Sequence, residues 1–116
     1  MKPTTPRPFS RFQALDVSLE LIRSLRGILS CLHRHDAALA GQLGRAASSI
    51  SLNLAEGNRR KGGDRMHHFR IAAGSADESR SALLVATAWG FLDKSQTDEP
   101  LALLDRILAM TWRLTH

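Results

Sequence analysis

The sequence predicts an all-α fold, an antiparallel up-down-up-down four-helix bundle. Of the 116 residues, 43% are hydrophobic but only 5% are aromatic, and tyrosine is absent, a composition typical of helices packed by leucine and alanine. Apolar residues recur at helical spacing along four segments of the chain. Short runs rich in proline, glycine or aspartate separate these segments, so consecutive helices are expected to lie antiparallel.

The first and the last helix are each expected to bury one apolar stripe. Three prolines near the start predict a flexible arm over residues 1–9, so that the bundle domain spans 10–116. The first helix is expected over about 10–33, and Thr97 or Asp98 is the expected N-cap of the fourth. The predicted buried residues are Leu15, Ile22, Leu25, Leu29 and Leu32 in the first helix, with Leu19, Leu21 and Ile28 widening this stripe, and Leu101, Leu104, Ile107, Leu108, Thr111 and Leu114 in the fourth.

The second helix is expected from about Ala37 to Glu56 or a little beyond, capped by Asp36 and ended by Gly57 in a left-handed conformation. Arg45 is the only charge between the two ends of this helix, whereas a solvated helix normally carries a charged outer face. One face holds Leu39, Leu43, Ala46, Ala47, Ile50 and Leu54, and another holds the small or apolar Gly41, Gly44, Ser48, Ser51, Leu52 and Ala55.

The third helix, expected over Asp64–Leu92 with Asp64 as its cap, has the same two-sided character. Its main apolar face is followed by a second line of mostly small or apolar residues. A bundle of this length has little interior with which to surround two helices, so a second subunit is the expected cover and we predict a homo-oligomer. The second line comprises Ile71, Ser75, Glu78, Ala82, Val85 and Trp89.

A seam of polar side chains is expected between the second and third helices. If these helices are antiparallel about a turn near residue 60, Glu78 lies level with Gln42 and Arg45. A buried carboxylate needs a partner, so we expect an Arg45–Glu78 ion pair, with Gln42 and Ser75 nearby, to set the register of the two helices. The predicted seam comprises Gln42, Arg45, Ser49, Asn53, Glu56, Ser75 and Glu78.

Catalytic and metal sites are not expected, and neither is a cofactor. Glu56 and Glu78 are the carboxylates of the informative region, but acid–base catalysis by this pair is less favoured than a structural role. Cys31 is the single cysteine, which excludes an intrachain disulfide and fits a reducing compartment. It alternates with His33 and His35, which a helix points in different directions, so a metal site is not predicted there.

The best functional candidate is a basic turn between the second and third helices. The net charge of +5 and pI of about 10.7 favour a polyanionic partner. Clustered cations at a turn suit phosphates and therefore RNA or DNA bound without sequence specificity, although a merely solvated basic loop explains them equally well. The candidate nucleic-acid-binding residues are Arg59, Arg60, Lys61, Arg65, His67, His68 and Arg70.

Two motifs on adjoining helices resemble a known family. The pattern SI-x-x-NLAEG-x-x-R, followed by F-x-IA-x-GS-x-x-E, is similar to that of the 23S rRNA-intervening-sequence proteins, whose superfamily includes the accessory protein of diversity-generating retroelements. The resemblance implies a four-helix bundle that assembles into a ring-like homopentamer, and an accessory role beside a partner enzyme. The residues that carry it are Ser49, Ile50, Asn53, Glu56, Gly57, Arg60, Phe69, Ala72, Gly74, Ser75 and Glu78.

The sequence thus favours a non-enzymatic homo-oligomeric scaffold or adaptor that binds RNA or DNA, with an unidentified protein as a further partner. The alternative is a protein-interaction module that binds no nucleic acid. A small-molecule pocket along the Gln42–Asn53–Glu78 line is a third, weaker hypothesis. Because neither a targeting signal nor a membrane-spanning segment is recognisable, cytoplasmic localisation is expected.

Overall fold

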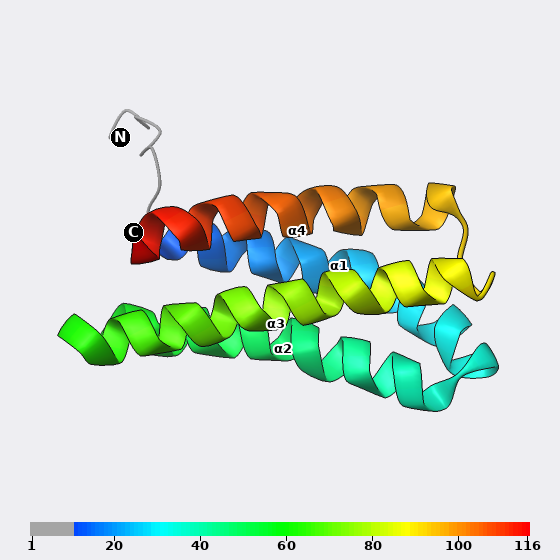
Figure 1. Ribbon diagram of the computed structural model, residues 1–116, viewed down its shortest axis with the longest axis horizontal. Helices are drawn as coiled ribbons and strands as arrows, with labels where there is room; N and C mark the ends of the chain where they lie inside the picture. The colour runs from blue at the N-terminus through cyan, green and yellow to red at the C-terminus, as the bar shows by residue number, and fades with distance from the viewer. Residues whose placement is uncertain (1–10) are drawn as a thin grey trace, which may run out of the picture.

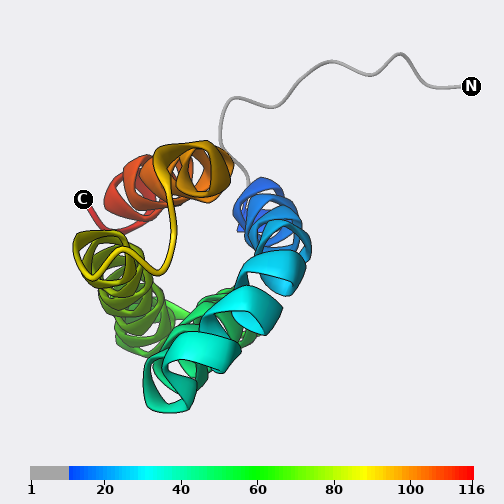
Figure 2. The same ribbon diagram turned by 90° about the vertical axis from the view of Figure 1, so that its right-hand side faces the viewer.

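Four helices make up the computed structural model, which describes residues 11–116 and their side chains from residue 13 onward; the predicted arm over 1–9 lies outside this range. Successive helices run in opposite directions, and α1 also packs against α4 (Figure 1). Seen end-on, the four surround one core (Figure 2). No strand occurs among the described residues, which confirms the all-α prediction. The helices are α1 (Arg11–His35), α2 (Ala37–Arg59), α3 (Gly62–Ala88) and α4 (Lys94–Thr115).

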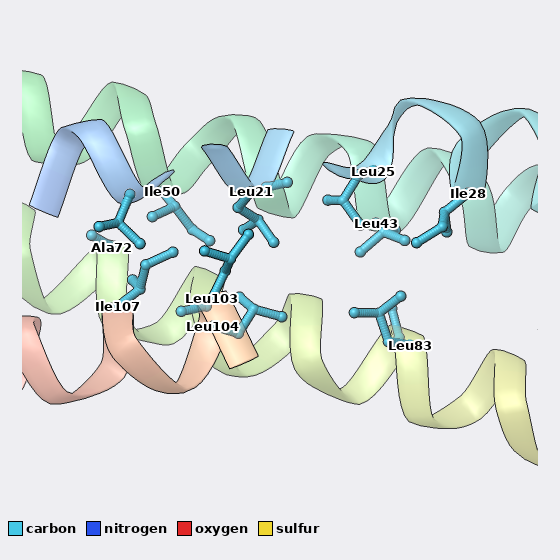
Figure 3. Close-up of a cluster of buried hydrophobic side chains, with 14 of the residues drawn as sticks. Leu21, Leu25, Ile28, Leu43, Ile50, Ala72, Leu83, Leu103, Leu104 and Ile107 are labelled. Atoms are coloured by element: carbon cyan, nitrogen blue, oxygen red, sulfur yellow. The ribbon is translucent and has the colours of Figure 1, made fainter. Parts of the chain in front are cut away.

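The core is built from aliphatic side chains of all four helices (Figure 3). The whole predicted stripe of α2 is buried. In α1 the predicted Leu21, Leu25, Ile28 and Leu32 are buried, but the prediction was partly wrong, because Leu15, Ile22 and Leu29 are only half-buried and Leu19 is exposed. Leucines and isoleucines occupy neighbouring rows of this helix, so spacing alone does not decide which row faces inward. The inner row of α1 comprises Ala14, Val17, Leu21, Leu25, Ile28 and Leu32.

The helix starts follow capping chemistry, with one correction. Asp36 caps α2 as predicted, and its carboxylate accepts a hydrogen bond from the Leu39 backbone N–H at 3.0 Å. Helix α4 begins before the predicted Thr97 or Asp98, because Asp93 and Gln96 form a capping box. The Asp93 carboxylate accepts from the Gln96 N–H, and the Gln96 side chain accepts from the Asp93 N–H. Two backbone donors are satisfied at once, which fixes the start of the helix there.

Gly57 does not end α2 as predicted. The helix continues to Arg59, and Gly57 is buried where the Phe69 ring lies directly against the α2 backbone. A Cβ atom on Gly57 would sit 2.5 Å from the Phe69 Cε1 atom. This glycine is therefore needed for the close approach of α2 and α3, and the left-handed backbone occurs instead at Gly62, with a φ of 59°.

The bounds of α3 also differ from those predicted. Lys61 occupies the N-cap position and makes no side-chain capping bond, while the predicted cap, Asp64, lies in the first turn of the helix. The helix ends at Ala88 because Gly90 takes a φ of 81°, outside the range of a right-handed helix. The predicted continuation to Leu92 was therefore wrong.

Substituting Gly57 by alanine is expected to lower the free energy of unfolding by about 1–3 kcal/mol, because the new methyl group must displace the buried Phe69 ring. The matched control is Gly27→Ala in α1, where nothing lies within 4 Å of the new Cβ. That control should raise the free energy of unfolding by up to about 1 kcal/mol through helix propensity. Denaturant titration measures both, and equal stability of the two variants would contradict the close approach.

Candidate nucleic-acid interface

The basic turn lies at one end of the bundle, where α2 passes into α3 (Figure 1). Only Arg60 and Lys61 separate the two helices. Residues 56–70 include five lysine or arginine side chains and two carboxylates, Glu56 and Asp64, so the formal charge of this segment is +3. The candidate nucleic-acid-binding residues therefore lie together in one small basic region.

Two of the predicted cations are neutralised within this region. The Glu56 carboxylate accepts from Arg59 Nη2 at 2.6 Å and from Arg60 Nε at 2.8 Å, while Arg60 Nη1 lies 3.2 Å from Asp64 Oδ2. The hydrogen bond from Arg60, followed by that from Arg59, lowers the pKa of Glu56 below its usual value. The same contact with Glu56 raises the pKa of Arg60. Glu56 therefore belongs to this ion network rather than to the predicted seam.

Two more of the predicted residues tie α2 to α3. Arg65 donates from Nε to the Gly57 carbonyl at 3.4 Å. His68 Nδ1 lies 3.0 Å from Asn53 Oδ1. Because the Asn53 amide group donates to the Ser49 carbonyl and hydroxyl, its oxygen faces the histidine, and Nδ1 of His68 carries the proton.

Three of the predicted residues remain available to a ligand. The side chains of Lys61, His67 and Arg70 are exposed and make no hydrogen bond or ion pair within the described part of the chain. The His67 ring only meets His68 edge-on, with centroids 5.6 Å apart. These three side chains are the groups of the basic turn that can contact a phosphate without first breaking an internal bond.

The predicted polar seam forms only in its middle. Ser75 donates to the Ser49 hydroxyl at 2.8 Å, and Ser49 in turn accepts from Asn53, so these three residues and His68 make a continuous chain. The expected Arg45–Glu78 ion pair is absent among the described residues. The register is as predicted, but Arg45 lies back along α2 over Gly41 and the Glu78 side chain is exposed, so neither is a buried charge in need of the other.

Comparison with known proteins places this arrangement in a family. The sequence model described as 23S rRNA-intervening sequence protein matches residues 12–113, nearly the whole chain. The chain belongs to this family. A search among curated proteins finds no match.

A solved structure supports the fold of this family member. The chain is similar to a protein of unknown function from the S23 ribosomal protein family of Bacteroides thetaiotaomicron, with a TM-score of 0.82. The alignment covers 90% of this chain and 96% of the other at 18% identity. At that identity the likeness shows the shared four-helix fold alone.

An exposed aromatic side chain at the basic end was missed from the sequence. Trp112 of this family member is 61% exposed and stacks on His116 with ring centroids 3.4 Å apart. The end of α4 lies at the same end of the bundle as the α2–α3 turn (Figure 1). The signal was available, since Trp112 lies off the helical row that contains Leu104, Ile107 and Thr111.

Other site classes receive little support in the described residues. No group of three or more histidine, cysteine or acidic residues over 11–116 could hold a metal ion. No described helix is long and apolar enough to cross a membrane. The Cys31 thiol lies 3.9 Å from the Phe91 carbonyl oxygen and from Gln96 Nε2, between α1 and the start of α4, so it takes part in helix packing.

Replacing Glu56 by glutamine should lower the melting temperature at neutral pH, and the difference from the natural protein should vanish in acid. The lowered pKa of Glu56 means that its carboxylate stabilises the folded state above the ordinary pKa of about 4.5, and that this stabilisation is lost as the pH falls through the lowered value. Glu99→Gln, at an exposed residue with no ion pair among the described residues, is the control. Thermal melts between pH 7 and about pH 3 test this, and a pH-independent difference would refute it.

Proposed function

We propose that this protein is a non-enzymatic homo-oligomeric scaffold that binds RNA or DNA without sequence specificity through its basic turn. The observation that carries the proposal is the trio of exposed, unpaired side chains Lys61, His67 and Arg70 at the end of the bundle. Cations on a turn contact phosphates, which repeat along any nucleic acid, so such a surface binds without reading bases.

Several polar side chains of α2 have structural partners, which supports a non-enzymatic role. Ser49 bonds to Ser75 and Asn53 across the α2–α3 contact. Ser51 shares a buried hydrogen bond of 2.8 Å with Ser18 and so ties α2 to α1. Glu56 is held by two arginines. Each of these groups is engaged in helix packing or in an ion network.

Assembly would combine several basic turns, each with low affinity for nucleic acid, into one binding surface of higher affinity. A net charge of +3 at one turn offers few phosphate contacts, and each alone is weak. Several copies in one assembly present the turn repeatedly, so that contacts after the first form at a high effective concentration. A homopentamer, as the family resemblance implies, would supply five such turns.

The alternative is a protein-interaction module whose basic turn is only solvated. The exposed apolar side chains Leu52, Val85 and Trp89 favour an interaction surface of some kind, since large apolar groups gathered on one face are typical of contact sites. A small-molecule pocket is less well supported. The hollow that contains Gln42 and Glu78 measures about 260 Å³, below the usual range for ligand sites, and Asn53 does not line it.

The double substitution Lys61→Ala/Arg70→Ala should weaken binding to a short RNA or DNA duplex. If both side chains contact phosphates, the slope of log K against log salt should fall by about 2 for each bound subunit. The control is Arg23→Ala/Arg26→Ala, which removes the same charge from exposed, unpaired positions on α1. Fluorescence anisotropy over a salt series measures both.

Two results would contradict the proposal. Equal loss of affinity in the two double variants would mean that only the net charge matters and that the basic turn is no site. Absence of salt-dependent binding in the unaltered protein would leave the protein-interaction module as the better description.

A further inference from the structure

The outward side of α2 and α3 is unusually apolar for a surface. Leu52 is 69% exposed, Ile71 37%, Val85 44% and Trp89 70%. Helical spacing places them on one broad face, which is called here the α2–α3 face. Small residues lie between them and permit close approach by another backbone: Gly41, Gly44, Ser48 and Gly74.

Two open hollows mark the α2–α3 face, and each contains one charged side chain. The first, of about 400 Å³, lies on α2 and is lined by Gly44, Arg45, Ser48, Ser49, Leu52 and Asn53. The second, of about 260 Å³, lies between the two helices and is lined by Leu39, Gln42, Glu78, Ser81, Ala82 and Val85. The face thus presents one positive and one negative group in apolar surroundings.

Arg45 and Glu78 have no partner in their own subunit. Neither side chain makes an ion pair or a hydrogen bond with any described residue. The guanidinium of Arg45 lies along its own helix, with Nη1 3.0 Å from the position of a Gly41 Cβ. The Ser49–Ser75 and Asn53–His68 bonds fix the antiparallel register and set Glu78 level with Arg45 along the bundle axis.

We propose that a second copy of this chain covers the α2–α3 face, with Arg45 of each subunit paired to Glu78 of its neighbour. The inference rests on the homo-oligomeric part of the proposed function and names the surface that would form the contact. Charge complementarity carries it. Burying either charge alone beneath an apolar partner is strongly unfavourable, whereas a second copy supplies the opposite charge at the same height.

The same pair selects the relative orientation of the two subunits. When neighbouring subunits lie side by side with their bundle axes pointing the same way, as in a ring, Arg45 on α2 of one lies at the same height as Glu78 on α3 of the next and can pair with it. When the axes point in opposite ways, a half-turn relates the two subunits and brings Arg45 opposite Arg45 and Glu78 opposite Glu78, so like charges meet. The pair therefore favours parallel subunits, and in a parallel assembly every basic turn lies at the same end.

Charge reversal tests the interface directly. Arg45→Glu and Glu78→Arg should each weaken subunit association by about 100-fold, because each places like charges in contact. The combined Arg45→Glu/Glu78→Arg protein should regain association, since the pair is restored with its signs exchanged. Arg26→Glu, an exposed charge reversal on α1, is the control and should leave association unchanged. Light scattering over a dilution series measures the mass of each protein.

Three outcomes would overturn the inference. The unaltered protein could be monomeric at every concentration. Both single reversals could leave the mass unchanged. Or the combined variant could regain the melting temperature of the unaltered protein without regaining association, which would mean that Arg45 and Glu78 pair within a single subunit.

Nucleic-acid binding is measured on the same proteins to separate the two proposals. If the charge reversals leave subunit association unchanged while salt-dependent nucleic-acid binding persists, the interface inference fails and the proposed function stands. If the single reversals weaken association and the combined variant restores it, but no variant binds nucleic acid, the interface inference stands and the binding function fails.

Discussion

The close contact between α2 and α3 is the constraint on which the rest of this structure depends. Gly57 lets the Phe69 ring reach the α2 backbone, and the hydrogen-bonded chain through Ser49, Asn53 and His68 continues the contact along the helices. Because both helices are locked in one register, the connection between them needs only two residues. The positions of the basic turn and of Arg45 and Glu78 on the outward face all follow from this register.

The apolar surfaces of the central helices are divided between two tasks. In α3, Phe69, Ala72, Ala76 and Leu83 face the core, while Ile71 and Val85, with Trp89 just after the helix, face outward. Helix α3 therefore has apolar residues on two faces, and the interior of a single bundle buries only one of them. The proposed subunit contact would use the outward set, whose small side chains and two opposite charges suit a partner of the same kind.

The sequence predicted the features that depend on the spacing of residues along a helix and missed those that depend on the direction in which a side chain points. Four helices, the buried stripe of α2 and the Asp36 cap followed from periodicity and local chemistry. The register of α2 and α3 was also predicted, but register fixes the height of a residue along the bundle and not the side to which a long side chain turns. The predicted Arg45–Glu78 ion pair within one subunit was therefore wrong.

Two local signals were misinterpreted. Glu56 lies three and four residues before Arg59 and Arg60, a spacing that favours ion pairs along one helix, but it was assigned to the seam. Gly57 was misread because a glycine near a helix end fits both a stop and a close approach, and only the position of Phe69 decides between them.

The short connection between α2 and α3 also bears on how the basic turn would meet a ligand. A long basic loop loses conformational freedom when it settles on a polyanion, and that loss opposes binding. Here Lys61 stands on a backbone held from both sides by helices, beside a glycine whose left-handed conformation is already adopted, and Arg70 stands within α3 itself. The entropy lost on binding is therefore confined mainly to side-chain rotamers, so this end of the bundle is organised for contact before any partner arrives.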